Sequence, residues 1–453
     1  MKPKKPADCP QNDLFRMELK NLIDQRHELA RLAMAIDWDG LADEFGALYV
    51  DRKGRPGIPT RLMAGLLYLK ATFKLSDEDV VRRWVENPYW QFFCGETYFR
   101  HELPIHPTSL TRFRKRIGEA GCEHLLSQTI EAGLKTKTVE ERDLDSVVVD
   151  TTVMEKAIAH PTDGRLYDTS RRRLVKLARG QGVALRQSYA RKAKHTLAQI
   201  GRYGHARQFK RLRRETKRLK TWLGRVVRDI ERKIANAPQQ QVVFADELAL
   251  AQRLLQQQRQ SKRKLYSLHA PEVECISKGK ARKPYEFGVK VSVATTLRSN
   301  FVLASHALPG NPYDGHTLHK TLLRCFESTG RIVKQAFVDR GYRGSQSTEG
   351  CKIYLAGQRR RMTRVLRKKL KRRNAIEPII GHMKSEGHLG RNHLQGAIGD
   401  AINALMAGAG QNLRMILKRL RLLCAWLLRV IRQSLVPTPQ LRAHRDLSSH
   451  VAI

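Results

Sequence analysis

The sequence predicts a mixed α/β protein in which a helical N-terminal part precedes a sheet, and a long helical insertion interrupts that sheet after its first strand. Three observations lead to this prediction. Residues 12–135 carry apolar side chains at helical spacing, whereas several short runs of Val, Ile, Phe and Ala after Asp145 have the composition of buried strands. Between the first two of these runs, residues 168–284 are rich in Arg, Lys and Gln.

The composition is that of a large, strongly basic globular chain. Its 453 residues allow about three domains, and its 41% hydrophobic content is sufficient for buried cores. Lys and Arg number 85 against 43 Asp and Glu, so the formal charge of +42 attracts polyanions and makes nucleic acid the leading partner. A ribosomal or membrane-surface protein can be equally basic, so charge alone does not decide.

Neither the cysteines nor the apolar segments indicate export or membrane insertion. The seven cysteines are scattered without zinc-like spacing, which is typical of free thiols in a reducing compartment. Residues 1–5 are not followed by the apolar core of a secretion signal. Six basic residues interrupt the Leu-rich segment 413–435, which favours a basic amphipathic helix over a membrane span. We therefore expect a cytoplasmic protein.

Two segments of the N-terminal part have recognisable helix starts. Ser76 is followed by three acids that suit the positive end of a helix dipole, and Thr108 opens a further helix with a basic face. Short helices joined in this way are compatible with DNA binding, and equally with a packing module that has a solvated basic side. We assign residues 1–140 to a helical DNA-binding or assembly domain.

The strands follow in an order that predicts the topology of the sheet. We expect strands at 147–150, 287–293, 301–304 and 332–339, a helix at 317–328 before the fourth, and a further strand at 352–355. This order, with acids on the first and fourth strands, is that of a ribonuclease-H-like fold, which makes those two strands neighbours. We assign 141–167 and 285–400 to this catalytic domain, and 401–453 to a basic helical tail.

The insertion, residues 168–284, has its own helical pattern. Apolar residues from Leu212 to Ile234 recur at gaps of seven, four, three, four and four residues, the spacing of a helical hairpin or coiled coil. A return helix is expected at 246–266, after the break at Ala237-Pro238. The surplus positive charge is either solvated or faces DNA, and we favour DNA contact.

Three acids indicate phosphoryl transfer. Asp150 and Asp339 each follow a buried-strand run, where parallel sheets place their ligands. Two adjacent carboxylates repel each other, and a hard divalent cation, Mg²⁺ or Mn²⁺, neutralises them. The third acid, Glu377, shares a helix face with Lys384, and Pro378 favours a helix start or kink there. Taken singly, such acids are more often turn, cap or surface ion-pair residues.

Basic residues flank two of these acids. Arg340, Tyr342 and Arg343 follow Asp339 in a loop that is either a glycine turn or a phosphate-binding element. The segment 359–373 holds ten Arg and Lys residues, which predicts contact with a DNA backbone; a solvated helix is the alternative.

Four further polar residues have weaker assignments. Asp314 and His316 either support the active site or are ordinary loop and N-cap residues of the helix that follows. We interpret Asp163 and Asp168 as turn residues and not as metal ligands.

In this combination the residues resemble the DDE transposases of bacterial insertion sequences, especially the group related to the fourth and fifth insertion-sequence families. The resemblance covers most of the chain and is strongest at residues 150–152, 285–290, 309–316 and 339–344, and at the pattern Arg373-x₃-Glu377-x₆-Lys384. It implies that Asp150, Asp339 and Glu377 form a catalytic triad that holds two divalent metal ions, Mg²⁺ or Mn²⁺. It also implies that Arg373 and Lys384 contact DNA near the transposon end.

Two features depart from the family's pattern. Leu370 stands where an aromatic Tyr is usual, and only 38 positions separate Asp339 from Glu377, so the large insertion follows Asp150 instead. The resemblance implies a nucleoid-associated bacterial enzyme that binds terminal inverted repeats and target DNA, works as a homo-oligomer with a dimer in the synaptic complex, and cleaves and joins strands. The alternatives are a ribonuclease-H-like nuclease without strand transfer and an inactive DNA-binding derivative.

Overall fold

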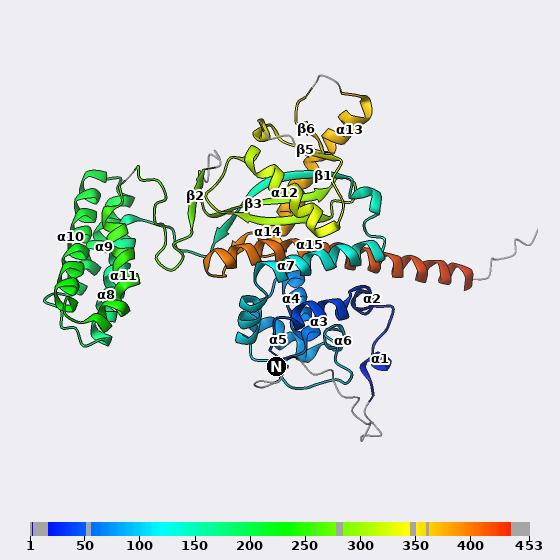
Figure 1. Ribbon diagram of the computed structural model, residues 1–453, viewed down its shortest axis with the longest axis horizontal. Helices are drawn as coiled ribbons and strands as arrows, with labels where there is room; N and C mark the ends of the chain where they lie inside the picture. The colour runs from blue at the N-terminus through cyan, green and yellow to red at the C-terminus, as the bar shows by residue number, and fades with distance from the viewer. Residues whose placement is uncertain are drawn as a thin grey trace, which may run out of the picture.

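The protein is described here by a computed structural model that covers residues 2, 17–50, 56–258, 260–277, 284–344, 350–358 and 362–435. The first three arginines of the basic segment 359–373 and the last part of the segment 401–453 lie outside these residues. The chain is a mixed α/β protein with a helical N-terminal region (Figure 1). Within the described ranges no helix is both long and apolar enough to cross a membrane.

The N-terminal region consists of short helices around one central helix. Its elements are α1 (Leu19–Leu22), α2 (Glu28–Ala35), α3 (Trp38–Gly46), α4 (Thr60–Phe73), α5 (Asp77–Glu86), α6 (Pro88–Phe93) and α7 (Thr108–Lys135). The helix starts expected at Ser76 and Thr108 are confirmed, and the Ser76 hydroxyl accepts the N–H of Asp79 at 3.0 Å. Helix α4 is central because eleven of its side chains, spread over its whole circumference, are buried.

A seven-stranded sheet follows, with the order β2-β3-β1-β5-β6, β4 beside β3 and β7 beside β1. Its strands are β1 (Ser146–Lys156), β2 (Glu274–Ser277), β3 (Tyr285–Thr296), β4 (Val302–Leu308), β5 (Gln335–Val338), β6 (Lys352–Leu355) and β7 (Arg391–Asn392). β1 pairs antiparallel with β3 and parallel with β5. The prediction that the first and fourth expected strands, now β1 and β5, are neighbours is therefore confirmed. The short strand β2, which ends the insertion, was not expected.

Helices cover both faces of the sheet. They are α12 (Asp314–Thr329), α14 (Ile376–Ser385) and α15 (Gly396–Leu435). Helix α13 (Arg364–Arg372) has no buried residue and covers neither face, and single 3₁₀ turns are formed by η1 (Glu141–Asp143), η2 (Arg340–Tyr342) and η3 (Arg373–Ala375). Val147 and Val149 of β1 face a core shared with α12 and the N-terminal helices. Val148 and Met154 face the other side, where Ile376, Ile380 and Met383 of α14 pack.

Helix α15 differs from the tail that the sequence suggested. Its residues from Ala401 to Leu420 are largely buried, and it packs on α4, α7 and β4 (Figure 1). The amide of Asn412 binds both the N–H and the carbonyl of Val302, at 2.8 Å each. Gly410 permits close approach to α4, because a Cβ there would lie 2.5 Å from the Ala71 carbonyl oxygen. This helix therefore joins the N-terminal region to the sheet.

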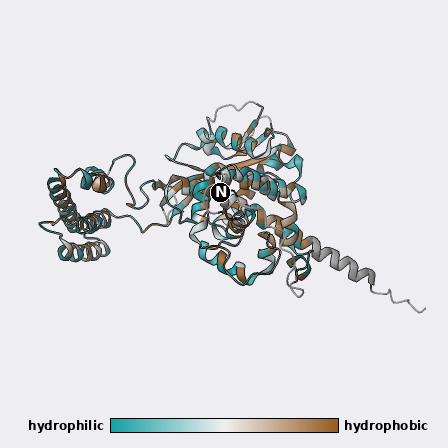
Figure 2. Cartoon of the chain, turned by 60° about the horizontal axis from the view of Figure 1, so that its bottom comes forward, coloured by the Kyte–Doolittle hydropathy of each residue, from teal (hydrophilic) through white to brown (hydrophobic). Residues whose placement is uncertain are grey.

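The insertion is a separate helical module with its own apolar core. It comprises α8 (Asp163–Gly180), α9 (Ala190–His205), α10 (Phe209–Ile234) and α11 (Pro238–Gln256). Figures 1 and 2 show, from two directions, that it stands to one side of the sheet. The return helix starts earlier than expected, since Pro238 occupies its first position. Asp163 and Asp168 lie in α8 and not in a turn, and Asp168 pairs with Arg171 at 2.6 Å.

Candidate active site

Two aspartates meet where β5 leaves β1. Val148 lies opposite Phe337 in the parallel pair, and Asp150 and Asp339 each follow two residues later, so the register places them at the same level. Beyond this point, within the part of the chain that the structure describes, the same edge of β1 has no strand partner until β7 joins it at Glu155. One oxygen of each carboxylate accepts a backbone N–H at 2.8 Å, from Thr151 and from Gly341. The open edge thus presents two oriented carboxylates.

Asp314, at the start of α12, belongs to the same group. One of its oxygens would lie 3.4 Å from a Cβ on Gly341, and an oxygen of Asp339 would lie 3.0 Å from that point. The Thr151 hydroxyl donates to Asp314 at 3.1 Å, and the Lys290 ammonium pairs with it at 3.1 Å. The sequence expectation of a supporting role therefore has a structural basis, because Asp314 is tied to the residue next to Asp150.

Tyr342 requires a correction. We expected it among the DNA-contacting residues, but its side chain is 0% exposed and lies in the core behind the loop. Burial raises the pKa of Tyr342 well above its ordinary value, and the negative charges of Asp150, Asp314 and Asp339 act in the same direction. Among the described residues its hydroxyl forms no hydrogen bond of full geometry, although a weaker interaction with Ser292 acts to lower that pKa. Tyr342 is therefore placed behind the acids and not against DNA.

Glu377 comes from the helix that covers the same face of the sheet. Strand alternation assigns Asp150 to the face of Val148 and Met154, against which α14 packs. Helix α14 begins at Ile376, as expected from Pro378, and Glu377 lies exposed in its first turn. Asp150, Asp339 and Glu377 do not form one cluster in this structure. Over the described ranges, no three His, Cys, Asp or Glu side chains lie close enough together to hold a metal ion.

The basic residues near these acids divide into exposed and structural groups. Helix α13 has no buried residue, and Arg364, Arg367, Lys368 and Lys371 are exposed. Lys369 instead donates to the Gln335 side chain at 2.8 Å, and Arg372 donates to the Leu297 carbonyl at 2.7 Å. These two residues hold α13 to the end of the sheet.

The remaining predicted residues lie in varied settings, on elements that cover both faces of the sheet. Arg340 and Arg343 are exposed in and after η2, and Arg340 also donates to the Ala356 carbonyl at 3.3 Å. Arg373 donates to the Asn374 side chain at 3.3 Å, and Lys384 lies half-buried near the end of α14. His316 is exposed, and its ring packs edge-on to Tyr313.

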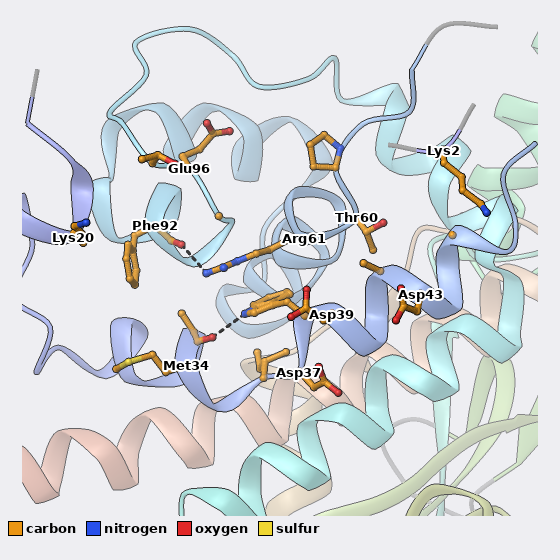
Figure 3. Close-up of a pocket in the computed structure, with 18 of the residues that line it drawn as sticks. Lys2, Lys20, Met34, Asp37, Asp39, Asp43, Thr60, Arg61, Phe92 and Glu96 are labelled. Atoms are coloured by element: carbon orange, nitrogen blue, oxygen red, sulfur yellow. Dashed lines mark hydrogen bonds between the residues drawn. The ribbon is translucent and has the colours of Figure 1, made fainter. Parts of the chain in front are cut away.

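A hollow of about 980 Å³ lies far from these residues, among the N-terminal helices. Figure 3 shows Asp37, Asp39 and Asp43 along it, and Arg61 reaching across toward the Phe92 carbonyl, to which it donates at 3.1 Å. Its acidic lining repels phosphates. If the N-terminal region contacts DNA, it therefore uses other faces.

Sequence reasoning missed two neighbours of the acids. Lys290 and Thr151 both bind Asp314, but neither was given a role. Both lie inside the segments 150–152 and 285–290, which carry the family resemblance. Their role depends on the pairing of β1 with β3, which places Thr151 opposite Ser292, two residues along β3 from Lys290.

Comparison with known proteins identifies two transposase domains in this chain. The family described as Transposase domain (DUF772) matches residues 17–116, and the Transposase DDE domain matches residues 222–409. The second range includes Asp314, Asp339 and Glu377 and begins after Asp150. An uncharacterized protein, ORF8 in the nfe locus of Rhizobium meliloti, is 52% identical over 209 residues, which are 46% of this chain and 100% of that protein. No solved structure matches. The chain belongs to the insertion-sequence DDE transposases.

Proposed function

We propose that this transposase cleaves DNA at the ends of its element and joins the released 3′ ends to target DNA, in a divalent-metal-dependent reaction at Asp150, Asp339 and Glu377. The observation that carries the proposal is the placement of Asp150 and Asp339 at one level on two parallel, paired strands. Asp339 directly follows β5, at the carboxyl end of a parallel strand, where such sheets bind ligands. Asp150 lies within β1, two residues past the point where β5 pairs with it, because the strand expected to end at Asp150 continues to Lys156. We also propose that the sheet and its helices form a ribonuclease-H-like domain.

The donor set fits Mg²⁺ or Mn²⁺. Carboxylate oxygens are the ligands that these hard ions prefer, and the two aspartates, with Asp314 beside them, concentrate negative charge at one open strand edge. Asp150 and Asp339 would hold the metal, and Glu377 would complete the site from α14. When bound, a pair of such ions activates the attacking oxygen and stabilises the leaving oxygen.

The chain's own residues prepare this site. Backbone N–H groups orient Asp150 and Asp339. Lys290 offsets part of the negative charge by pairing with Asp314, and the buried Tyr342 fills the space behind the acids and excludes water there. No protein nucleophile is required, because the attacking group is water or a DNA hydroxyl.

The exposed cations around the acids would bind the substrate backbone. The exposed cations of α13 and the exposed Arg340 and Arg343, together with the half-buried Arg373 and Lys384, provide positive charge after Asp339 and on both sides of Glu377 in sequence. Arginine binds phosphate oxygens in a bidentate geometry, which fixes the register of a duplex without reading its bases. We propose that these residues bind the terminal inverted repeats, and that a homo-oligomer brings two ends together.

The test is cleavage and joining of labelled DNA taken from the two flanks of the coding sequence, in Mg²⁺ and in EDTA. We expect Asp150→Ala and Asp339→Ala each to reduce both reactions by more than about 100-fold, because each removes a metal ligand. Asp163→Ala, which removes an exposed aspartate in α8, is the matched control. Wild-type rates in the Asp339→Ala protein would refute the proposal. Cleavage without joining would indicate the nuclease. DNA binding without either reaction would indicate the inactive derivative.

A further inference from the structure

Helix α10 carries a row of arginines that the reaction described above does not use. The six are Arg211, Arg214, Arg218, Arg225, Arg228 and Arg232, all exposed. Their gaps are three or four residues, apart from one gap of seven, so they share one face of the helix. The row spans 21 residues, or about 32 Å, which is the length of roughly nine base pairs of duplex DNA.

Three arginines of this row form ion pairs with buried acids of the same helix. Glu215 and Asp229 each have side chains less than 10% exposed, whereas the side chains of Arg214, Arg218 and Arg232 are 66%, 55% and 61% exposed. Glu215 pairs with Arg218 at 2.9 Å, and Asp229 pairs with Arg232 at 3.6 Å. The guanidinium groups are thereby oriented while much of their surface stays open to an anionic partner, which lowers the entropy lost on binding.

A second arginine-lined feature lies at the C-terminal half of the row. A hollow of about 490 Å³ is lined by Arg225, Arg228 and Arg232 of α10 and by Arg186 and Tyr189 from the loop between α8 and α9, with the acids Asp229 and Glu231 also at its wall. The backbone N–H of Arg186 donates to Asp229 at 2.9 Å, which fixes the loop. Four arginines from two segments therefore surround one concave site of a size that admits phosphate groups.

The stability of the module does not explain the arginine row. Like charges three and four residues apart destabilise a helix. The core of the module is formed on the opposite side of α10 by apolar residues such as Leu219, Leu223 and Ile230. Arg214, Arg218 and Arg232 compensate the buried acids, whereas no ion pair with an acid is formed by Arg211, Arg225 or Arg228 among the described residues. A binding role therefore accounts better for the arginines that have no acidic partner.

We propose that the arginine row, with Arg186, is a second DNA-binding surface that holds the backbone of the duplex adjoining the element end. This inference rests on the proposed function, since it takes DNA as the substrate. The module stands to one side of the sheet (Figures 1 and 2), so a duplex held there is the continuation of the one at the active site. The contact is with phosphates and does not depend on base sequence.

The test uses the full-length protein in EDTA, so that DNA is bound but not cut. Three labelled probes are compared: a duplex from the flank of the coding sequence, a scrambled duplex of equal length and composition, and a duplex RNA. The row variant is Arg225→Gln/Arg228→Gln. The matched control is Lys176→Gln/Arg179→Gln, which removes two exposed charges from α8 of the same module.

We expect the row variant to bind both DNA duplexes more weakly by the same factor. The slope of log affinity against log salt concentration should become shallower by about two. The affinity that the row variant loses between about 50 and 200 mM salt should therefore be roughly tenfold smaller than the loss for the wild type. The control should keep the wild-type slope. Thermal unfolding checks that both variants are folded; if the first row variant is not, Arg211→Gln/Arg214→Gln tests the other end of the row.

Equal slopes for the row variant and the control would overturn the proposal. Tighter binding of the RNA duplex, with the same loss in the row variant, would overturn the assignment of DNA. Failure of the wild type to bind any duplex would refute the proposed function itself, which separates that failure from a failure of the arginine row.

Discussion

A buried ion network at the end of β1 gives a quantitative test of how the module is attached. The Lys156 ammonium, with a side chain 4% exposed, lies 2.7 Å from Asp400 of α15 and 2.8 Å from Glu272, which precedes β2. The amide of Asn392 in β7 also donates to Asp400, at 2.6 Å. One lysine therefore ties the first strand, the returning end of the insertion and the last helix.

Lys156→Met keeps most of the side-chain volume and removes the charge. Breaking a buried ion pair from one side costs about 3–5 kcal/mol, because the other charge stays buried without its partner. Asp400 keeps its bond to Asn392, and Glu272 is 17% exposed, so both retain partial compensation. We therefore expect a loss at the lower end, about 3 kcal/mol. Adding Asp400→Asn removes the carboxylate that lost its partner, and should restore about 1–2 kcal/mol of the unfolding free energy.

The effect should depend on pH in a defined direction. Burial raises the pKa of Asp400 above 3.8, and Lys156 acts against that rise. Folded Asp400 thus binds a proton more readily than the unfolded chain, so stability falls as pH rises from 3.8 through the raised pKa. Without Lys156 the pKa of Asp400 rises further, so the loss of stability in Lys156→Met should increase with pH over a wider range. The loss should become smaller on acidification.

Urea unfolding followed by tryptophan fluorescence, at pH 7 and at pH 4.5, measures both effects. Asp163→Ala serves as a control for an exposed charge. A loss below about 1 kcal/mol for Lys156→Met at pH 7, or a defect that is equal at the two pH values, would refute this account of the network.

Three further predictions concern packing, the acids and the N-terminal region. Gly288→Ala should lower the unfolding free energy by about 3 kcal/mol or more, measured by urea unfolding, since its Cβ would lie 1.9 Å from the Met154 carbonyl oxygen. Tyr342→Phe should change the unfolding free energy by no more than about 1 kcal/mol, because the ring stays buried and the hydroxyl interacts only weakly with Ser292; a loss of more than about 2 kcal/mol in thermal unfolding would contradict this. Arg114→Lys should cost about 1–3 kcal/mol, because Arg114 donates two hydrogen bonds to Asp77. Burial acts to raise the pKa of Asp77, yet the hydrogen bonds from Arg114 lower it below 3.8. Their contribution to stability is therefore present above pH 3.8 and is lost as pH falls through the lowered pKa. Acid unfolding of the variant should start at higher pH than that of the wild type.

The parts of the fold that depend on local pattern could be predicted from sequence. Apolar runs located β1, β3, β4, β5 and β6, and Ser76, Thr108 and Pro378 marked helix starts, because capping and proline geometry act over a few residues. The order of strands and acids was enough to predict that β1 and β5 are neighbours.

Features that depend on tertiary packing could not be predicted in this way. Tyr342 has arginine neighbours in sequence, which suggested DNA contact, but the fold turns it into the core. Residues 401–420 have a basic segment after them and suggested a tail, whereas their small and apolar side chains fit between α4 and β4. Lys290 and Asp314 are 24 residues apart, so their ion pair is visible only once β3 and α12 are placed.

The position of α15 also sets the order in which this protein can fold during synthesis. Helix α4 is made early, yet it packs against residues near Gly410, which leave the ribosome more than 300 residues later. At roughly 5–20 residues per second this delay is on the order of 20 to 70 s. During that time the apolar face of α4 that receives α15 has no native cover. The core around α4 is therefore completed only after α15 has been made.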